Sequence, residues 1–210
     1  MTLYSANATL LLTVNIGGNV SVSSGTLEFG RLTNSLPIQT LSIAGTTTVS
    51  GGTLRMAGAN TGSLVANGNV TVNGGKLSMD STGAGQTLNL GTGADFAMSA
   101  GTLLLTYTSA VSYDQIVGST GSQFALSGGI IDLNNNLWDY SANYQIFSGF
   151  DSGAVAGLSF INYDTSYTPS LDNSGVLAFA AIPEPSTWLL TIAGLGAVIA
   201  FARRGKKLAV

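Results

Sequence analysis

The 210-residue chain contains neither cysteine nor histidine, and the two absences exclude several kinds of site. Disulfide bonds cannot contribute to its stability, and zinc sites built from cysteine and histidine cannot form. Catalytic triads that use a histidine base are excluded as well. Because histidine titrates near neutral pH without perturbation, a cytosolic enzyme of this size rarely lacks it altogether. We therefore expect a protein that is not an enzyme and that holds no metal and no cofactor.

Charged residues are also scarce, at 8% of the chain. Four of the seven basic residues lie in the last eight positions, so residues 1 to 182 keep only Arg31, Arg55 and Lys76 against nine acids. Three basic residues against nine acids leave this part of the chain with a net charge of −6. We therefore expect no nucleic-acid partner, because a phosphate backbone needs a basic surface.

The last 28 residues combine three parts in order. The motif Pro183-Glu184-Pro185 precedes an uncharged apolar stretch of 15 residues, and a basic cluster follows. A bilayer core normally takes about 20 residues, so we expect a single transmembrane helix that anchors only marginally, with its basic end on the cytoplasmic side. The expected anchor residues are Trp188, Leu189, Leu190, Ile192, Leu195, Val198, Ile199 and Phe201, and the expected basic stop is Arg203, Arg204, Lys206 and Lys207.

This tail resembles the PEP-CTERM sorting signal of Gram-negative bacteria, which has a Pro-Glu-Pro motif, one hydrophobic helix and a terminal Arg-rich cluster. The resemblance covers residues 183 to 210 and implies recognition by an exosortase-type membrane protease, removal of the tail and delivery of the body to the cell surface or extracellular polysaccharide. An ordinary tail anchor with a Pro-rich hinge is the alternative. Residues 1 to 16 lack a basic region and a small-residue cleavage site, so they do not resemble a signal peptide, and we expect a fragment or a misassigned start.

One pattern recurs five times in the body of the chain. Aligned on a shared glycine, the copies are 27, 23, 26 and 28 residues apart, and the column reads Gly25, Gly52, Gly75, Gly101 and Gly129. The positions five and three before the glycine, and two and four after it, are apolar in nineteen of twenty cases, Thr47 being the exception. This alternation predicts a strand on each side of a glycine corner with positive φ. Upstream pairs such as Leu41 and Ile43 predict a third strand.

Three short strands per repeat are typical of one coil of a right-handed parallel β-helix. We therefore expect an all-β fold, with a β-solenoid of about five coils at residues 1–135, a β-rich cap at 136–180 and the sorting tail with its transmembrane helix at 181–210. Outward Glu28 and Arg55 should stack on adjacent coils. A β-sandwich or a stack of hairpins is the alternative.

The repeat also resembles the autotransporter-associated β-strand repeat, whose core reads like Gly-Gly-Thr-Leu after an alternating strand. Gly51-Gly52-Thr53-Leu54 matches this core best, and Gly128-Gly129-Ile130-Ile131 departs from it furthest. The resemblance implies a surface-exposed β-helical passenger rather than a particular activity.

The second half of the body is rich in aromatic residues, since six of the seven tyrosines lie between Tyr107 and Tyr167. These rings could form an exposed face that stacks on sugars, but we expect them to fill the core of the cap; the candidates are Trp138, Tyr140, Tyr144, Tyr163 and Tyr167. Glycan cleavage needs paired carboxylates, whereas the acids here are scattered singly, and we expect each to be solvated at the surface. Residues 134–136, all asparagine, are expected to form a turn rather than a ladder.

Three functions fit these features: a structural or adhesive surface protein, a carbohydrate-binding module, and a polysaccharide-degrading β-helix enzyme. We expect the first, an exported protein of the bacterial cell surface or extracellular matrix. Its expected partners are the exosortase-type protease and, through the tail, the inner membrane, with exopolysaccharide as a further candidate.

Overall fold

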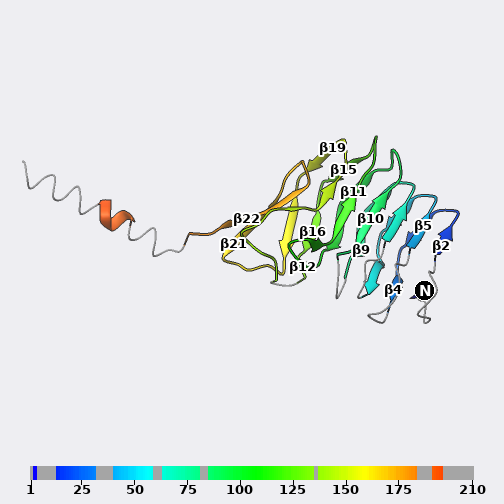
Figure 1. The fold of residues 1–210 in the computed structure, drawn as a ribbon, viewed down its shortest axis with the longest axis horizontal. Coiled ribbons are helices and arrows are strands. Elements are labelled where there is room, and N and C mark those ends of the chain that lie inside the picture. The colour runs from blue at the N-terminus through cyan, green and yellow to red at the C-terminus, as the bar shows by residue number, and fades with distance from the viewer. Residues whose placement is uncertain are drawn as a thin grey trace, which may run out of the picture.

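The structure, a computed structural model, describes residues 2–3, 13–31, 40–58, 63–80, 85–134, 137–183 and 191–195. Short parallel coils follow one another along a single axis, from the blue strands β2 and β5 to the yellow strands of the last coil (Figure 1). This arrangement confirms the predicted parallel β-solenoid. A β-sandwich is wrong, because its sheets are antiparallel, whereas all strand pairs in the two large sheets described are parallel.

The smaller of the two large sheets contains the strand that the sequence predicts upstream of each alternating segment. Within the described residues, its strands run in the order β18-β14-β10-β8-β5-β2. Their bounds are β2 (Thr13–Ile16), β5 (Thr40–Ile43), β8 (Ser63–Ala66), β10 (Thr87–Leu90), β14 (Gln115–Val117) and β18 (Phe147–Ser148). Leu41, Leu64 and Leu88 share one register row and are buried, so the third strand is confirmed.

The larger sheet contains the strands on either side of each glycine corner, and in β9 and β11 these two strands are continuous. In the part of the chain that the structure describes, its strands are β1 (Thr2–Leu3), β3 (Val20–Val22), β4 (Thr26–Arg31), β6 (Thr47–Val49), β7 (Thr53–Gly58), β9 (Val70–Ser78), β11 (Phe96–Leu104), β15 (Gln123–Leu126), β16 (Gly129–Asp132), β19 (Ser152–Val155) and β20 (Leu158–Ile161). Leu54, Leu77 and Leu103 lie in one register row and are fully buried, as the repeat alignment predicts. Stacking these rows gives the coils one continuous apolar core.

The glycine column has two physical causes. Positive φ is confirmed at Gly25, Gly101 and Gly129, with values of 66°, 89° and 104°. The prediction of positive φ is wrong for Gly52 and Gly75. At these two positions glycine is required because the preceding coil leaves no room for a Cβ. A Cβ would lie 2.7 Å from the Val22 side chain at Gly52, and 2.7 Å from the Val49 side chain at Gly75. Glycine is needed there because real Cβ contacts are not that short.

Parallel pairing continues beyond residue 135, where the sequence predicts the end of the solenoid. Strands β18, β19 and β20 stack on β14, β15 and β16 and form a further coil. The repeat is hard to see here because Gly153 occupies the register position that Phe96 and Phe124 fill in the two preceding coils. A glycine in the apolar column removes the alternation from the sequence.

Antiparallel strands complete the C-terminal end. Strands β17 (Tyr144–Gln145), β22 (Val176–Ala181) and β21 (Tyr167–Leu171) form a three-stranded sheet in that order. A turn at residues 172–175 joins β21 to β22, with the Gly175 amide donating to the Asp172 carbonyl over 3.0 Å. A separate hairpin, β12 (Tyr107–Ser109) and β13 (Ser112–Tyr113), interrupts the coil between β11 and β14.

Candidate functional site

The sorting tail leaves the body from the last strand of the C-terminal sheet. Strand β22 pairs with β21 as far as Ala181 opposite Tyr167, and the Ile182 amide then donates to the Ser166 carbonyl over 2.8 Å. Ile182 is half exposed and Pro183 is exposed. In Figure 1 this hairpin lies at the end of the solenoid opposite β2 and β5. Among the described residues, the motif therefore begins directly after the last residue that the folded body holds.

Most of the predicted tail lies outside the described residues. This applies to Glu184, Pro185, Trp188, Leu189, Leu190, Val198, Ile199, Phe201, Arg203, Arg204, Lys206 and Lys207. Residues 191–195 are helical and exposed, with the predicted anchor residues Ile192 and Leu195 on their surface. In the described ranges, no helix has the length and apolar character needed to cross a membrane.

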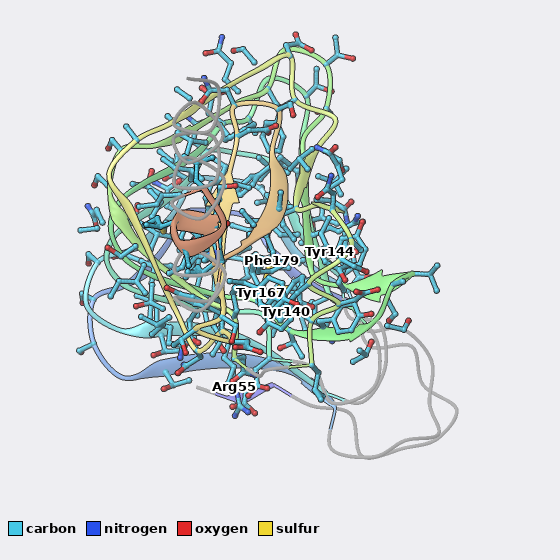
Figure 2. All side chains as sticks on the ribbon, turned by 90° about the vertical axis from the view of Figure 1, so that its left-hand side faces the viewer. Arg55, Tyr140, Tyr144, Tyr167 and Phe179 are labelled. Carbon is cyan, nitrogen blue, oxygen red and sulfur yellow. The ribbon has the colours of Figure 1, made fainter. Side chains whose placement is uncertain are left out.

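The predicted stack of Glu28 and Arg55 is confirmed and includes a third member. Arg55 donates to Glu28 over 3.0 Å from one guanidinium nitrogen and to Asp80 over 2.8 Å from another. The hydrogen bond from Arg55 to Asp80 is the main cause that raises the pKa of Arg55. Figure 2 shows Arg55 at the lower edge of the molecule, apart from the labelled aromatic residues. These partly exposed ion pairs contribute at most about 1 kcal/mol each to stability. They therefore indicate which residues of adjacent coils are aligned rather than account for the stability of the fold.

Asp132 is buried, so the prediction of a solvated acid is wrong for this residue. One carboxylate oxygen accepts hydrogen bonds from the Asn162 side chain over 2.7 Å and from the Asn134 amide over 3.0 Å. The other oxygen lies 3.6 Å from the Lys76 ammonium. Asn134 has a φ of 50° and its amide donates to Asp132, whereas the turn predicted at residues 134–136 stays a prediction because residues 135 and 136 lie outside the described ranges.

Asp114 is the most buried acid among the described residues, and the prediction of a surface position is wrong here too. Its two oxygens accept hydrogen bonds from the Gln86 amide over 2.7 Å and from the Thr106 amide over 2.6 Å. Burial raises the pKa of Asp114 well above its usual value, although these hydrogen bonds act in the opposite direction. Since Asp114 directly follows β13, the carboxylate ties the base of the β12–β13 hairpin to the preceding coil.

A side-chain ladder, which the sequence analysis missed, connects one corner of successive coils. Asn19 accepts from the Thr46 amide over 2.9 Å, Asn69 from the Asp95 amide over 3.0 Å, and Asp95 from the Gln123 amide over 2.8 Å. These residues share the position just before the first apolar residue of each repeat. That recurrence of Asn and Asp was the signal that could have revealed the ladder. These hydrogen bonds satisfy backbone amides at a corner of the coils, so the role of the Asn and Asp side chains is structural.

The aromatic residues of the second half mainly fill the C-terminal core, as predicted. Trp138 and Tyr144 are buried, with ring centroids 4.9 Å apart at a steep angle. Tyr140 and Tyr167 are half-buried and stacked 4.6 Å apart, with Phe179 against Tyr140 (Figure 2). Burial and the hydrogen bond with Tyr107 raise the pKa of Tyr144. Because Trp138 and Tyr144 are inaccessible, the predicted candidates do not form one exposed row for sugar stacking.

Comparison with known proteins identifies the tail. Residues 181–207 match the family model described as the PEP-CTERM protein-sorting motif. No curated protein and no solved structure matches the chain. The match confirms the resemblance of the tail, and the motif implies an exported protein that an exosortase processes and that reaches the cell envelope or surface.

Proposed function

We propose that the chain is a structural or adhesive protein of the bacterial cell surface or extracellular matrix, a β-helical rod that an exosortase-type protease separates from its tail. One observation carries this proposal: Pro183, the first residue of the Pro-Glu-Pro motif within the matched residues 181–207, directly follows Ile182, the last described residue that the folded body binds through its backbone. A protease can therefore reach the tail while the body stays folded. The resemblance of the coils to autotransporter-associated repeats supports a surface role.

In the proposed mechanism, the apolar segment from Trp188 to Ala202 holds the chain in the inner membrane during export. The basic cluster that follows keeps the C-terminal end on the cytoplasmic side. The exosortase recognises Pro183-Glu184-Pro185 and releases the body. Coils stacked about 4.8 Å apart make the body a short rod, so its role is positional rather than catalytic. The buried acids support this role, because Asp114 and Asp132 both hold hydrogen bonds of the fold.

The proposal is tested by locating the protein in cells that encode an exosortase. The variant changes Pro183, Glu184 and Pro185 to Ala, and Ser186→Ala serves as a control outside the Pro-Glu-Pro tripeptide. We expect the wild type and the control outside the inner membrane, and the variant retained in it. Deletion of the exosortase gene should reproduce the variant's distribution. An unchanged distribution in both cases would contradict the sorting function.

A further inference from the structure

A cleft of about 590 Å³ lies at the C-terminal end of the solenoid. One wall is formed by residues 147–153 of the last coil, and the other by Asn173 and Ser174 of the turn between β21 and β22. The cleft is distinct from the sorting tail and from the cluster of Tyr140, Tyr144 and Tyr167. None of the functions considered above uses it.

Hydrogen bonds hold both walls in place without a ligand. The Asp172 carboxylate accepts from the Ser174 amide and the Val176 amide, each over 2.9 Å, which fixes the turn. Asn173 accepts from the Val155 amide over 2.8 Å, and the Gln145 side chain donates to the Ser174 carbonyl over 2.7 Å. These two bonds fasten the turn to the last coil. A ligand would therefore bind a preformed site and lose little free energy in ordering it.

The floor of the cleft is aromatic. Phe124 and Phe147 are buried and stacked 4.7 Å apart, and Phe150 meets Phe124 edge-on at 5.2 Å. Phe150 itself is only half-buried and lines the cleft. Gly153 allows this arrangement, because a Cβ at that position would collide with the Phe124 ring. The half-buried Phe150 is thus the ring of this floor that a ligand can contact.

The remaining lining is polar and carries one acidic group, Asp151. One Asp151 oxygen accepts from the Gly121 amide over 3.0 Å, and within the described ranges its other oxygen has no partner. Among the described residues that line the cleft, none is basic. The described cations Arg55 and Lys76 form ion pairs elsewhere. An anionic ligand is therefore disfavoured, whereas a neutral ligand with many hydroxyl groups can bond to the carboxylate, amide and serine groups.

We infer that this cleft binds a neutral saccharide. A sugar ring has an apolar face that fits the exposed part of Phe150, and hydroxyl groups that donate to Asp151 and pair with the Gln145 side chain. The inference does not depend on how the tail is sorted.

The test is titration of the full chain, in detergent solution, with cellobiose, maltotriose and diacetylchitobiose, and with digalacturonate as the anionic comparison. We expect saturable binding of at least one neutral probe, with a Kd of about 0.1 to 1 mM, and at least about tenfold weaker binding of digalacturonate. Phe150→Ala should weaken binding about 3- to 10-fold, and Asp151→Asn should weaken it by a similar factor.

Ser152→Trp covers the case in which Phe150→Ala fails to fold, because Ser152 is exposed and an indole there should block the cleft without removing a core side chain. Asp139→Asn, which changes an exposed carboxylate outside the cleft, should bind like the wild type. The inference is overturned if no neutral probe binds saturably, if digalacturonate binds as tightly, or if Ser152→Trp binds unchanged.

Discussion

The repeated coils and the C-terminal end of this molecule are stabilised in different ways. In the coils, every layer uses the same positions, so Leu54, Leu77 and Leu103 form one buried row above a shared glycine corner. At the C-terminal end, Trp138, Tyr144 and the 172–175 turn make contacts that no other layer repeats. The difference shows that a stack can be extended by repetition but must be ended by individual contacts. The cleft and the exit of the sorting tail both lie at that non-repeating end.

The largest expected effect comes from breaking the C-terminal end at Trp138. Trp138→Ala removes a buried ring that contacts Tyr107 and Tyr144 and donates to the Leu133 carbonyl. Loss of a large buried side chain typically costs about 3–5 kcal/mol. Urea denaturation should show this loss, whereas Val111→Ala, at a side chain that is 93% exposed, should change stability by less than about 0.5 kcal/mol. Equal stability of both variants would contradict the role assigned to the ring.

A pair of glycine substitutions separates the two causes of the glycine column. Gly75→Ala should cost about 1–3 kcal/mol, because its Cβ would meet the Val49 side chain and the Gly52 carbonyl. Gly25→Ala has open space around the Cβ but a φ of 66°, so only the conformational cost of about 1 kcal/mol is expected. Denaturation of both variants measures the difference. If Gly25→Ala were the more damaging, crowding by the preceding coil would not explain Gly75.

Replacing Thr47 by an apolar residue should make the buried positions of the repeat uniform. Thr47 is the exception among the apolar repeat positions, is fully buried, and its hydroxyl has no hydrogen-bond partner among the described residues. Thr47→Val keeps the shape and removes the unpaired group, so we expect a gain of about 1 kcal/mol in the free energy of unfolding. Thr48→Val, on the half-exposed neighbour, is the matched control and should gain less. A loss of stability in Thr47→Val would mean that the hydroxyl is satisfied.

Asp114, at the base of the β12–β13 hairpin, is expected to give the free energy of unfolding a pH-dependent slope. Because burial raises its pKa in the folded state, the folded protein holds this proton more tightly than the unfolded chain. The resulting stabilisation is present below the unfolded pKa of about 3.9 and is lost as pH rises through the folded pKa. The free energy of unfolding of the wild type, relative to Asp114→Asn, should therefore fall as pH rises from about 4. A rise would show that the two amide hydrogen bonds outweigh burial.

The coils could be predicted from the sequence because the same pattern of apolar positions around a glycine recurs along the chain. Each Gly-centred segment repeats the same apolar positions, and parallel stacking then follows. The last coil was harder to predict, since Gly153 removes the alternation where Phe124 and Phe96 maintain it. Burial of Asp114 could not be predicted either, because the Gln86 amide that it binds lies 28 residues away. The start of the sorting motif was predictable because it is a local pattern of residues.

The central claim is that the chain has a folded body that ends at Ile182 and a tail that is removed. The most direct measurement is the intact mass of the mature protein recovered outside the inner membrane. We predict a mass below the 21.3 kDa of the full chain, with a new C-terminus beyond Ile182 and the complete β21–β22 hairpin retained. A full-length mass, or a C-terminus within β22, would contradict the account.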